Sequence, residues 1–384
     1  MRNWLLPENF EDILPPQAQR IDGMRAKLLE LFRVHGYQLV IPPMLEYLES
    51  LLTGTGHDLD LRTFKLVDQL SGRMMGVRGD ITPQVARIDA HLLNRKGVTR
   101  LCYAGSVLLT RPRGLGSTRE PLQIGAEIYG HPGIESDLEI QQLLVESLEA
   151  CGVSGARLDI GHVAVFRAIC RHGRVGSELE SELYGALGGK DLPALRVATK
   201  PLPKATRQAL LALPELYGDA TVLERARRTL PGYPEIDSAL RNLKILSRSG
   251  RVPVSVDLAD LRGYHYHSGV VFAAYAPGVA NAVALGGRYD EVGKAFGRAR
   301  PATGFSMDLR DLARAVPHET GASAIRAPYS NDAGVANAIR RLRTAGEVVV
   351  VGLPGHAAGG VQPACDRELV KRAGKWTVRK LGKS

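Results

Sequence analysis

The first regular hydrophobic pattern of the chain predicts a long amphipathic helix that begins after two prolines, at 15–16. Apolar residues recur at helical spacing and would form its buried face: Ile21, Met24, Leu28, Leu31 and Phe32. Gly36 suits a left-handed stop at the end of this helix. The β-prone run at 37–41 is followed by prolines 42–43, where a strand loses a hydrogen-bond donor. We therefore expect a helix that leads into a short strand at a sheet edge.

A second pattern predicts a strand with two different faces over residues 122–129. One face would be apolar, with Leu122, Ile124, Ala126 and Ile128, and the other would carry Gln123, Gly125, Glu127 and Tyr129. If the apolar face packs on the core, the opposite face either lines a cleft or meets solvent, and the pattern alone leaves both open. In a cleft, the amide of Gln123 and the carboxylate of Glu127 would suit an ammonium or an imidazole group.

The other segments show either the period of a strand or the period of a helix. Strands are expected near residues 63–68, 73–78, 99–110, 157–161, 252–258, 266–274 and 280–285. Helices are expected from Thr82 to about residue 97, with Val85, Ile88 and Leu92 facing inward, then over 136–151, over 163–171 and from about residue 308. Thr82 and Ser136 stand where helix-capping residues are found; the second has Glu139 three residues on, as in a capping box.

The chain divides into a core and two less regular parts. Residues 173–250 show short helical segments broken by Gly and Pro without convincing strands, which indicates a helical insertion. Residues 316–328 are rich in small residues and proline and are expected to be a linker. Residues 329–384 predict a helix, a buried strand and a terminal hairpin. We expect an α+β protein with a core over 1–315 and a small α/β extension over 329–384.

Composition removes several classes of protein. The 384 residues include 44% hydrophobic and 23% charged residues, which is typical of a globular chain. Four cysteines without a CxxC spacing argue against a disulfide framework, structural zinc or a redox motif. An N-terminus interrupted by prolines and acids is no signal peptide, and no window has the apolar length of a membrane span. A cytoplasmic protein is expected.

The net charge of +10 is concentrated at the C-terminus. Residues 364–384 hold five of these ten net positive charges, so the rest of the chain is only mildly basic. Such a tail is either a solvated face or a region that attracts tRNA, and we expect the solvated face.

Three other places carry residues capable of chemistry. Asp80 and Thr82, two residues apart at a helix start, suit either helix capping or an amine ligand. Arg262 suits either a carboxylate ligand or a surface ion pair. His265 and His267 share a strand face but have no acidic or cysteine partner nearby, so we expect no metal there. No phosphate-binding GxxxxGK loop and no HExxH motif occur.

Taken in order, these segments resemble the catalytic core of histidyl-tRNA synthetases, which have a class II aminoacyl-tRNA synthetase fold. The stretch 36–43 (GYQLVIPP) is similar to class II motif 1, the dimer-forming helix and strand. Residues 77–83 (VRGDITP) are similar to the family's RPEGT segment, and 119–130 (REPLQIGAEIYG) to the second half of motif 2. Residues 262–272 and 286–290 (GGRYD) resemble the two histidine-specific signatures. The resemblance implies an antiparallel sheet flanked by helices.

The resemblance also implies a histidine-binding pocket. Asp80, Thr82 and Gln123 would hold the amino group of the ligand. Glu127 would face its imidazole and Arg262 its carboxylate. The walls would come from three further side chains: Tyr266, His267 and Tyr289. Two positions depart from the family, since Asp80 replaces a longer Glu and His267 replaces a Tyr.

The residues that activate ATP in the synthetases are missing. Leu109 stands where motif 2 supplies an arginine to the α-phosphate, and Asp311 stands at the position of the motif 3 arginine. An aspartate beside a triphosphate repels the charge that an arginine would stabilise. The stretch 329–384 is also too short for the anticodon-binding domain of the synthetases. We expect no adenylation and no binding of tRNA.

A class II core of this kind resembles the regulatory subunits of ATP phosphoribosyltransferase, in the first step of histidine biosynthesis. The runs 80–87 (DITPQVAR) and 365–370 (CDRELV) are similar to that family. Membership implies a non-catalytic subunit without cofactor or metal, a homodimer within a hetero-oligomer. A short catalytic partner would depend on it for activity and for feedback inhibition by histidine. The alternatives are an active histidyl-tRNA synthetase and a free-standing amino-acid sensor.

Overall fold

The computed structural model describes residues 4–53, 57–112, 114, 116–248, 251–316, 324–355 and 364–381. The chain forms two compact units, Met1–Val316 and Pro317–Ser384, and each is described by itself. Parts of several predicted segments lie outside the described residues, among them 249–250 at the end of the insertion, 317–323 in the linker, and 356–363 and 382–384 in the C-terminal extension.

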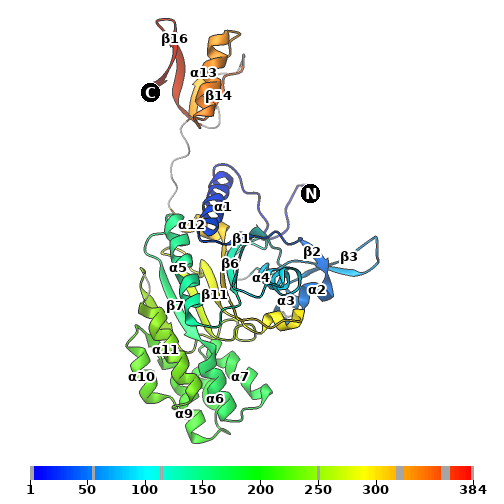
Figure 1. Ribbon diagram of the computed structural model, residues 1–384, viewed down its shortest axis with the longest axis vertical. Coiled ribbons are helices and arrows are strands. Elements are labelled where there is room, and N and C mark those ends of the chain that lie inside the picture. Colours follow the sequence, from blue (N-terminus) through cyan, green and yellow to red (C-terminus); the bar gives the residue numbers. More distant parts are fainter. Residues whose placement is uncertain are drawn as a thin grey trace. The chain divides into compact units, whose positions relative to one another are not determined.

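A nine-stranded sheet forms the framework of the first unit, in the order β1-β5-β6-β12-β11-β10-β7-β9-β8 (Figure 1). Its strands in chain order are β1 (Gln38–Leu39), β5 (Thr99–Ser106), β6 (Leu122–Tyr129), β7 (Arg157–His162), β8 (Tyr217–Gly218), β9 (Val254–Asp257), β10 (Val270–Tyr275), β11 (Ala284–Arg288) and β12 (Ala302–Asp308). The pairs β1–β5 and β7–β9 are parallel, and the other neighbours are antiparallel. The predicted α+β fold with a mainly antiparallel sheet is confirmed.

The helices α1 (Gln17–Val34), α5 (Ile134–Ala150) and α12 (Leu309–Ala315) pack on one another and on the sheet. The predicted helix after the two prolines is confirmed, and Ile21, Met24, Leu28 and Phe32 are buried on it. The apolar face of β6 belongs to the same core, where the ring of Phe32 meets that of Phe305 at 6.0 Å. Packing against these helices therefore leaves the polar face of β6 on the opposite side of the sheet.

The predicted helical insertion lies at one end of this unit (Figure 1). After α6 (Val163–His172) it contains α7 (Ser177–Gly188), α8 (Leu192–Ala198), α9 (Lys204–Ala212), the 3-10 turn Leu213–Glu215, α10 (Val222–Thr229) and α11 (Pro234–Arg248). Among the described residues of the insertion, 173–248, the expectation of no strands is wrong at β8, two residues that pair with β9. Across the described helices, none combines the length and hydrophobicity needed to cross a bilayer.

A small three-stranded sheet, β2-β4-β3, is formed by residues that lie between β1 and β5 in the sequence. It contains β2 (Leu45–Tyr47), β3 (Phe64–Val67) and β4 (Met74–Val77), with α2 (Leu48–Leu52) and α3 (His57–Leu61) between the first two strands. The next helix, α4 (Thr82–Arg87), continues as a π-helical segment, Ile88–Leu93. The wider π turn changes the helical period, so Leu92, expected to face inward, is 62% exposed, whereas Asp89 and Ala90 are buried.

The predicted capping box is absent from this unit, and one of its strands was not predicted. The capping box does not form: α5 starts after Gly133, the Ser136 hydroxyl donates to the Gly133 carbonyl, and Glu139 binds Arg100 instead. Strand β12 was not predicted, because its Ala, Gly and Asp residues have low strand propensity. A short 3-10 helix, Val292–Phe296, lies between β11 and β12.

The second unit is a four-stranded sheet, β14-β13-β15-β16, with one helix. It contains β13 (Ala324–Ala327), α13 (Ala333–Thr344), β14 (Val349–Val351), β15 (Cys365–Arg372) and β16 (Lys375–Lys380). A separate apolar cluster of Ile325, Val335, Ile339 and Leu369 holds it together. The linker prediction for 316–328 is therefore wrong at 324–327, where β13 forms the centre of the sheet.

Candidate functional site

The side chain of Glu127 is the centre of a buried polar network on the first unit's sheet. It is 1% exposed, so the polar face of β6 does not meet solvent at this point. The hydroxyls of Thr82 and Tyr103 donate to its Oε1 atom at 3.3 and 3.1 Å, and the Tyr289 hydroxyl donates to Oε2 at 2.5 Å. A buried carboxyl group that accepts hydrogen bonds from three hydroxyl groups forms an ordered polar site.

Burial changes the acidity of this carboxyl group. It raises the pKa of Glu127 to about 8, and the hydrogen bonds from Tyr289 and Tyr103 offset only part of that effect. Glu127 is therefore mostly protonated at neutral pH. A protonated carboxyl group can share its proton with a basic ligand, so that no uncompensated charge is left in the buried site.

Asp80 and Gln123 form a second pair beside this network. The Gln123 amide nitrogen donates to Asp80 Oδ1 at 2.8 Å, and its oxygen accepts from the Ile81 N–H at 2.9 Å. Asp80 also accepts from the Thr82 N–H at 3.0 Å and so satisfies a free donor at the start of α4. The expected cap by the Thr82 hydroxyl is wrong, because that hydroxyl contacts the Tyr103 hydroxyl at 2.8 Å and Glu127.

A chain of aromatic rings extends from Tyr289, which binds Glu127. The Tyr266 ring lies 5.0 Å from that of Tyr289, and the His267 ring lies 5.3 Å from that of Tyr266. The Tyr266 hydroxyl is buried and has no hydrogen-bond partner among the described residues. Burial lowers the pKa of His267 to about 4, and its Nδ1 donates to the Arg288 carbonyl at 3.3 Å. His267 is thus neutral at physiological pH.

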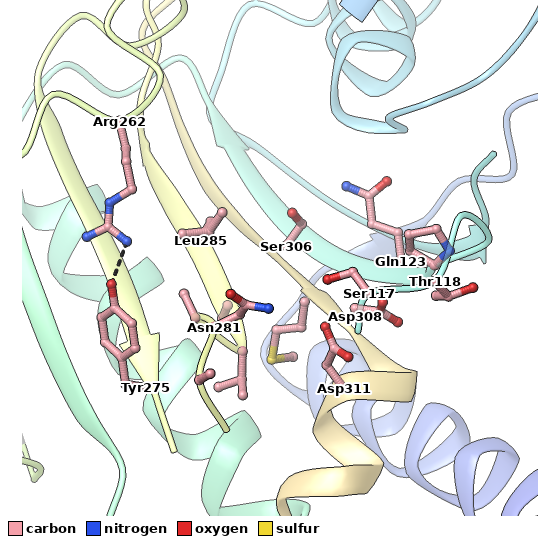
Figure 2. Close-up of a pocket in the computed structure, with 16 residues that line it drawn as sticks. Ser117, Thr118, Gln123, Arg262, Tyr275, Asn281, Leu285, Ser306, Asp308 and Asp311 are labelled. Carbon is pink, nitrogen blue, oxygen red and sulfur yellow. Dashed lines mark hydrogen bonds between the residues drawn. The ribbon is translucent and has the colours of Figure 1, made fainter. Parts of the chain in front are cut away.

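A pocket of about 390 Å³ opens at Gln123 (Figure 2). Figure 2 shows Arg262 and Tyr275 on one side of this pocket and Gln123, Ser117 and Thr118 on the other. Arg262 donates to both carboxylate oxygens of Asp260 and to the Tyr275 hydroxyl at 2.8 Å. The ion-pair interpretation of Arg262 therefore holds, although the same guanidinium also lines the pocket.

The predicted site residues thus form three connected groups. Thr82 and Tyr289 each bind Glu127, and Asp80, which accepts from the Thr82 N–H, is joined to Gln123. The Tyr266 ring packs on that of Tyr289 and the His267 ring packs on that of Tyr266, whereas Arg262 lies across the pocket from Gln123.

The pocket offers little to a triphosphate. Arg262 is the one cation among its lining residues, all of which the structure describes, and Asp308 and Asp311 also line it. Leu109, at the position of the absent motif 2 arginine, is buried and 1% exposed. Carboxylates in a pocket repel phosphate oxygens.

Sequence reasoning missed three residues of this site. Tyr103 on β5 and Tyr129 on β6 belong to the hydroxyl network, where the hydroxyl oxygens of Tyr129 and Tyr289 lie 3.2 Å apart. Tyr129 shares the face of Gln123 and Glu127 by the period of two, so the alternation could have found it. Gly304 pairs with Glu127 across β12 and β6, and a methyl group there would lie 1.5 Å from Oε2.

No cluster of three or more His, Cys, Asp or Glu side chains suited to a metal ion occurs within the described ranges. The pair His265 and His267 belongs to the aromatic surroundings of Tyr264 and Tyr266 instead.

Comparison with known families gives two matches. Residues 9–312 match the histidyl-tRNA synthetase family. Residues 322–379 match the family described as the ATP phosphoribosyltransferase subunit HisZ C-terminal domain.

Curated relatives are similar over nearly the whole chain. A protein of Ralstonia pickettii (strain 12J), named ATP phosphoribosyltransferase regulatory subunit, is 60% identical over 378 residues, which cover 98% of each chain. One of Ralstonia nicotianae with the same name is 60% identical over 380 residues, which cover 99% of this chain and 98% of that one.

Two solved structures are similar in fold. An ATP phosphoribosyltransferase regulatory subunit/histidyl-tRNA synthetase from Bacillus halodurans C superposes with a TM-score of 0.81 at 26% identity, over 94% of this chain and 95% of that one. A histidyl-tRNA synthetase from Nostoc sp. PCC 7120 has a TM-score of 0.78 at 16% identity, over 98% and 94% of the two chains, and supports the fold alone.

Proposed function

Because the chain belongs to the family of ATP phosphoribosyltransferase regulatory subunits, we propose that its buried carboxyl site binds histidine and that this binding inhibits a separate catalytic chain. The chain is a regulatory subunit of ATP phosphoribosyltransferase and not its catalytic component. The histidyl-tRNA synthetase alternative is not favoured by these relatives. We propose that the regulatory role depends on this histidine-binding pocket.

The network around Glu127 is the single observation that supports histidine most strongly. Its carboxyl group has a pKa of about 8, and free histidine has an imidazole that titrates near neutrality. The two groups can share one proton in a buried hydrogen bond, whereas an aliphatic ligand would leave Glu127 without such a partner. The unpartnered Tyr266 hydroxyl supplies a further polar contact to a ligand in this place.

The other end of the amino acid suits the groups nearer the pocket. Asp80 and Gln123 offer oxygen acceptors to an ammonium group, and Arg262 offers a guanidinium to a carboxylate. Arg262 keeps Asp260 and Tyr275 as partners when the ligand is absent, so it is already oriented. We propose that histidine lies between Glu127 and Arg262 and that its amino group lies at Asp80, Thr82 and Gln123.

Regulation requires a partner. We propose a short catalytic subunit that condenses ATP with phosphoribosyl pyrophosphate and that is active only with this chain. Histidine would favour a form of the chain with its pocket closed, and a coupling free energy of about 1–3 kcal/mol suffices for useful feedback. We also propose that two copies of the chain associate within the complex, that it does not bind tRNA and that it works in the cytoplasm.

Isothermal titration of the purified chain with histidine tests the pocket. The Glu127→Ala variant should lose binding, because the ligand imidazole loses its buried partner and a cavity replaces it. Val197→Asp on the exposed surface of α8 serves as a control that should bind like the wild type. Binding that is unchanged in Glu127→Ala would reject the assignment.

Formation of phosphoribosyl-ATP by the reconstituted complex tests the regulatory role. Activity of the catalytic partner should require this chain, and added histidine should inhibit it. In a complex that contains Glu127→Ala, activity should persist while inhibition by histidine is lost. Inhibition of equal strength in both complexes would place the histidine site elsewhere.

A further inference from the structure

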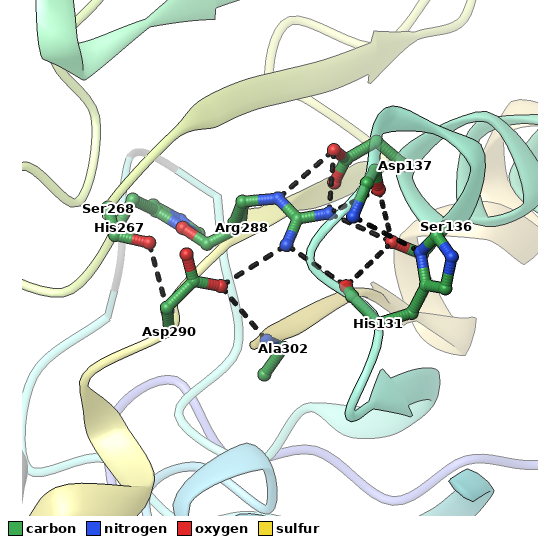
Figure 3. Close-up of polar contacts among 9 residues, drawn as sticks. His131, Ser136, Asp137, His267, Ser268, Arg288, Asp290 and Ala302 are labelled. Atoms are coloured by element: carbon green, nitrogen blue, oxygen red, sulfur yellow. Dashed lines mark hydrogen bonds and ion pairs between the residues drawn. The ribbon is translucent and has the colours of Figure 1, made fainter. Parts of the chain in front are cut away.

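Arg288 connects the histidine-specific part of the site to the start of helix α5. It ends strand β11 directly before Tyr289 and is 8% exposed. Its Nε and Nη2 atoms donate to the carboxylate of Asp137 at 3.0 and 2.8 Å. The same guanidinium also donates, as Figure 3 shows in part, to the Ser136 hydroxyl, the Gly133 and His131 carbonyls and Asp290.

This set of acceptors requires an arginine. The acceptors lie around the first turn of α5 at different angles, and the planar guanidinium with its five N–H donors reaches all of them from one side chain. A lysine has one nitrogen and cannot span them. The carboxyl of Asp137 is itself buried, and burial raises its pKa, although Arg288 counteracts this. The ion pair between Arg288 and Asp137 therefore depends on the position of both side chains.

The backbone of Arg288 is tied in the opposite direction, toward the site. Its carbonyl accepts from the Ser268 N–H at 2.7 Å and from His267 Nδ1 at 3.3 Å. The segment that carries Tyr266 and His267 is thereby fastened to β11. The stem of Arg288 also fills the space beside Gly269, where a Cβ atom would lie 2.9 Å from its Cδ.

Asp290 fixes the other side of Tyr289. Its N–H donates to the Ser268 hydroxyl at 2.9 Å, and its Oδ1 accepts from the Ala302 N–H at 3.0 Å and from Arg288 at 3.2 Å (Figure 3). Tyr289 thus lies between two anchored neighbours. Its hydroxyl meets Glu127 at 2.5 Å, a distance that a small backbone shift would break.

We infer that Arg288 is a positioning residue for the ligand: it does not touch histidine but holds the backbone of Tyr289 and the 266–268 segment, so that Tyr289 reaches Glu127. The inference rests on the proposed histidine site and adds a residue that determines its affinity. It gives Asp137, at the start of α5, a role in ligand binding although it lies outside the pocket lining.

Calorimetric titration of the full chain with histidine tests this role in Arg288→Lys. Affinity should fall about tenfold or more, because the charge remains but the anchor to α5 is lost. Arg300→Lys is the matched control: Arg300 is 6% exposed, pairs with buried Asp89 at 2.9 Å and does not contact the 266–268 segment. That control perturbs a buried ion pair of the same kind. It should nevertheless bind histidine within about threefold of the wild type, because the 266–268 segment keeps its contacts.

A double-mutant cycle separates positioning from general stability. If Arg288 acts through Tyr289, then Arg288→Lys should cost about threefold or less when it is added to Tyr289→Phe. An equal loss in both backgrounds, an equal loss in Arg300→Lys, or an affinity of Arg288→Lys within twofold of wild type would each overturn the inference.

If Arg288→Lys does not fold, Asp137→Asn provides the test. This variant keeps Arg288 but weakens its anchor at the start of α5, and it should weaken histidine binding about threefold or more. Unchanged binding in this variant would overturn the inference. Failure of the wild type to bind histidine would instead reject the proposed function on which the inference rests.

Discussion

At the scale of single residues, the environment of Glu127 makes histidine binding depend on pH. The carboxyl has a pKa of about 8 because it is buried, whereas the imidazole of free histidine titrates at about 6.5. Between these values the carboxyl holds a proton and the imidazole does not, so together they bring the one proton that their hydrogen bond needs. Calorimetry should show the highest affinity from about pH 6.5 to 8, with a fall of up to about tenfold per pH unit on either side.

The Glu127→Gln variant is the control for this pH profile. Its amide has no proton to lose, so the fall in affinity above pH 8 should disappear, while the fall on the acidic side, which comes from the ligand, should remain. If the affinity of Glu127→Gln for histidine fell above pH 8 as steeply as that of the wild type, this fall would come from another group.

Much of the site could be predicted from the sequence. The alternation along 122–129 placed Gln123 and Glu127 on one face, and the family motifs selected that face as a pocket. The pattern could not reveal whether the face is buried, because this depends on Tyr103 and Gly304 from the neighbouring strands and on Tyr289 just after β11. Long-range register brings these residues together, and no local signal encodes it.

At the scale of elements, the pairing of β6 with β12 leaves space for the Glu127 carboxyl only because residue 304 is a glycine. The Gly304→Ala methyl group would lie 1.5 Å from Oε2 and 2.7 Å from the Ala126 carbonyl oxygen. We expect this variant to lose histidine binding and to be destabilised by about 1–3 kcal/mol or more, as overpacking displaces the carboxyl. Calorimetry and chemical denaturation measure the two effects.

Gly23→Ala is the control for that substitution. Gly23 lies inside helix α1, where no atom lies within 4 Å of a new Cβ atom. Alanine in place of a mid-helix glycine should stabilise the protein by about 0.5–1 kcal/mol and leave histidine binding unchanged. If both glycine variants bound histidine equally well, the space opposite Glu127 would not be essential.

Elements with a strong period were predicted well, and those that depend on side-chain competition were not. Helix α1 was expected from its apolar spacing and forms as predicted. The capping box at Ser136 failed because Arg100 and Tyr37 hold the Glu139 carboxylate. The inward position of Leu92 failed because α4 widens into a π turn. In each case a contact or a local geometry outranked the sequence motif.

At the scale of the whole molecule, the two units have separate apolar cores. All the residues proposed to bind histidine lie in the first, and the cluster around Ile325 and Leu369 lies in the second. A chain truncated after Val316 should therefore fold and bind histidine within about twofold of the full chain, as calorimetry would measure. A loss of binding in a truncated chain that still unfolds cooperatively would mean that the second unit contributes to the pocket.

The edge of the large sheet is the place where a second copy of the chain is expected to bind. Strand β1 lies at that edge, Ile41 just after it is 82% exposed, and Leu39 in β1 and Val34 at the end of α1 are also exposed. Exposed aliphatic side chains next to a free strand edge are stabilised when a partner covers them. In sedimentation experiments Ile41→Asp should therefore shift the protein from dimer to monomer, whereas Val197→Asp, an exposed aliphatic residue on α8, should remain dimeric. A wild-type chain that sediments as a monomer at all concentrations would contradict this assignment.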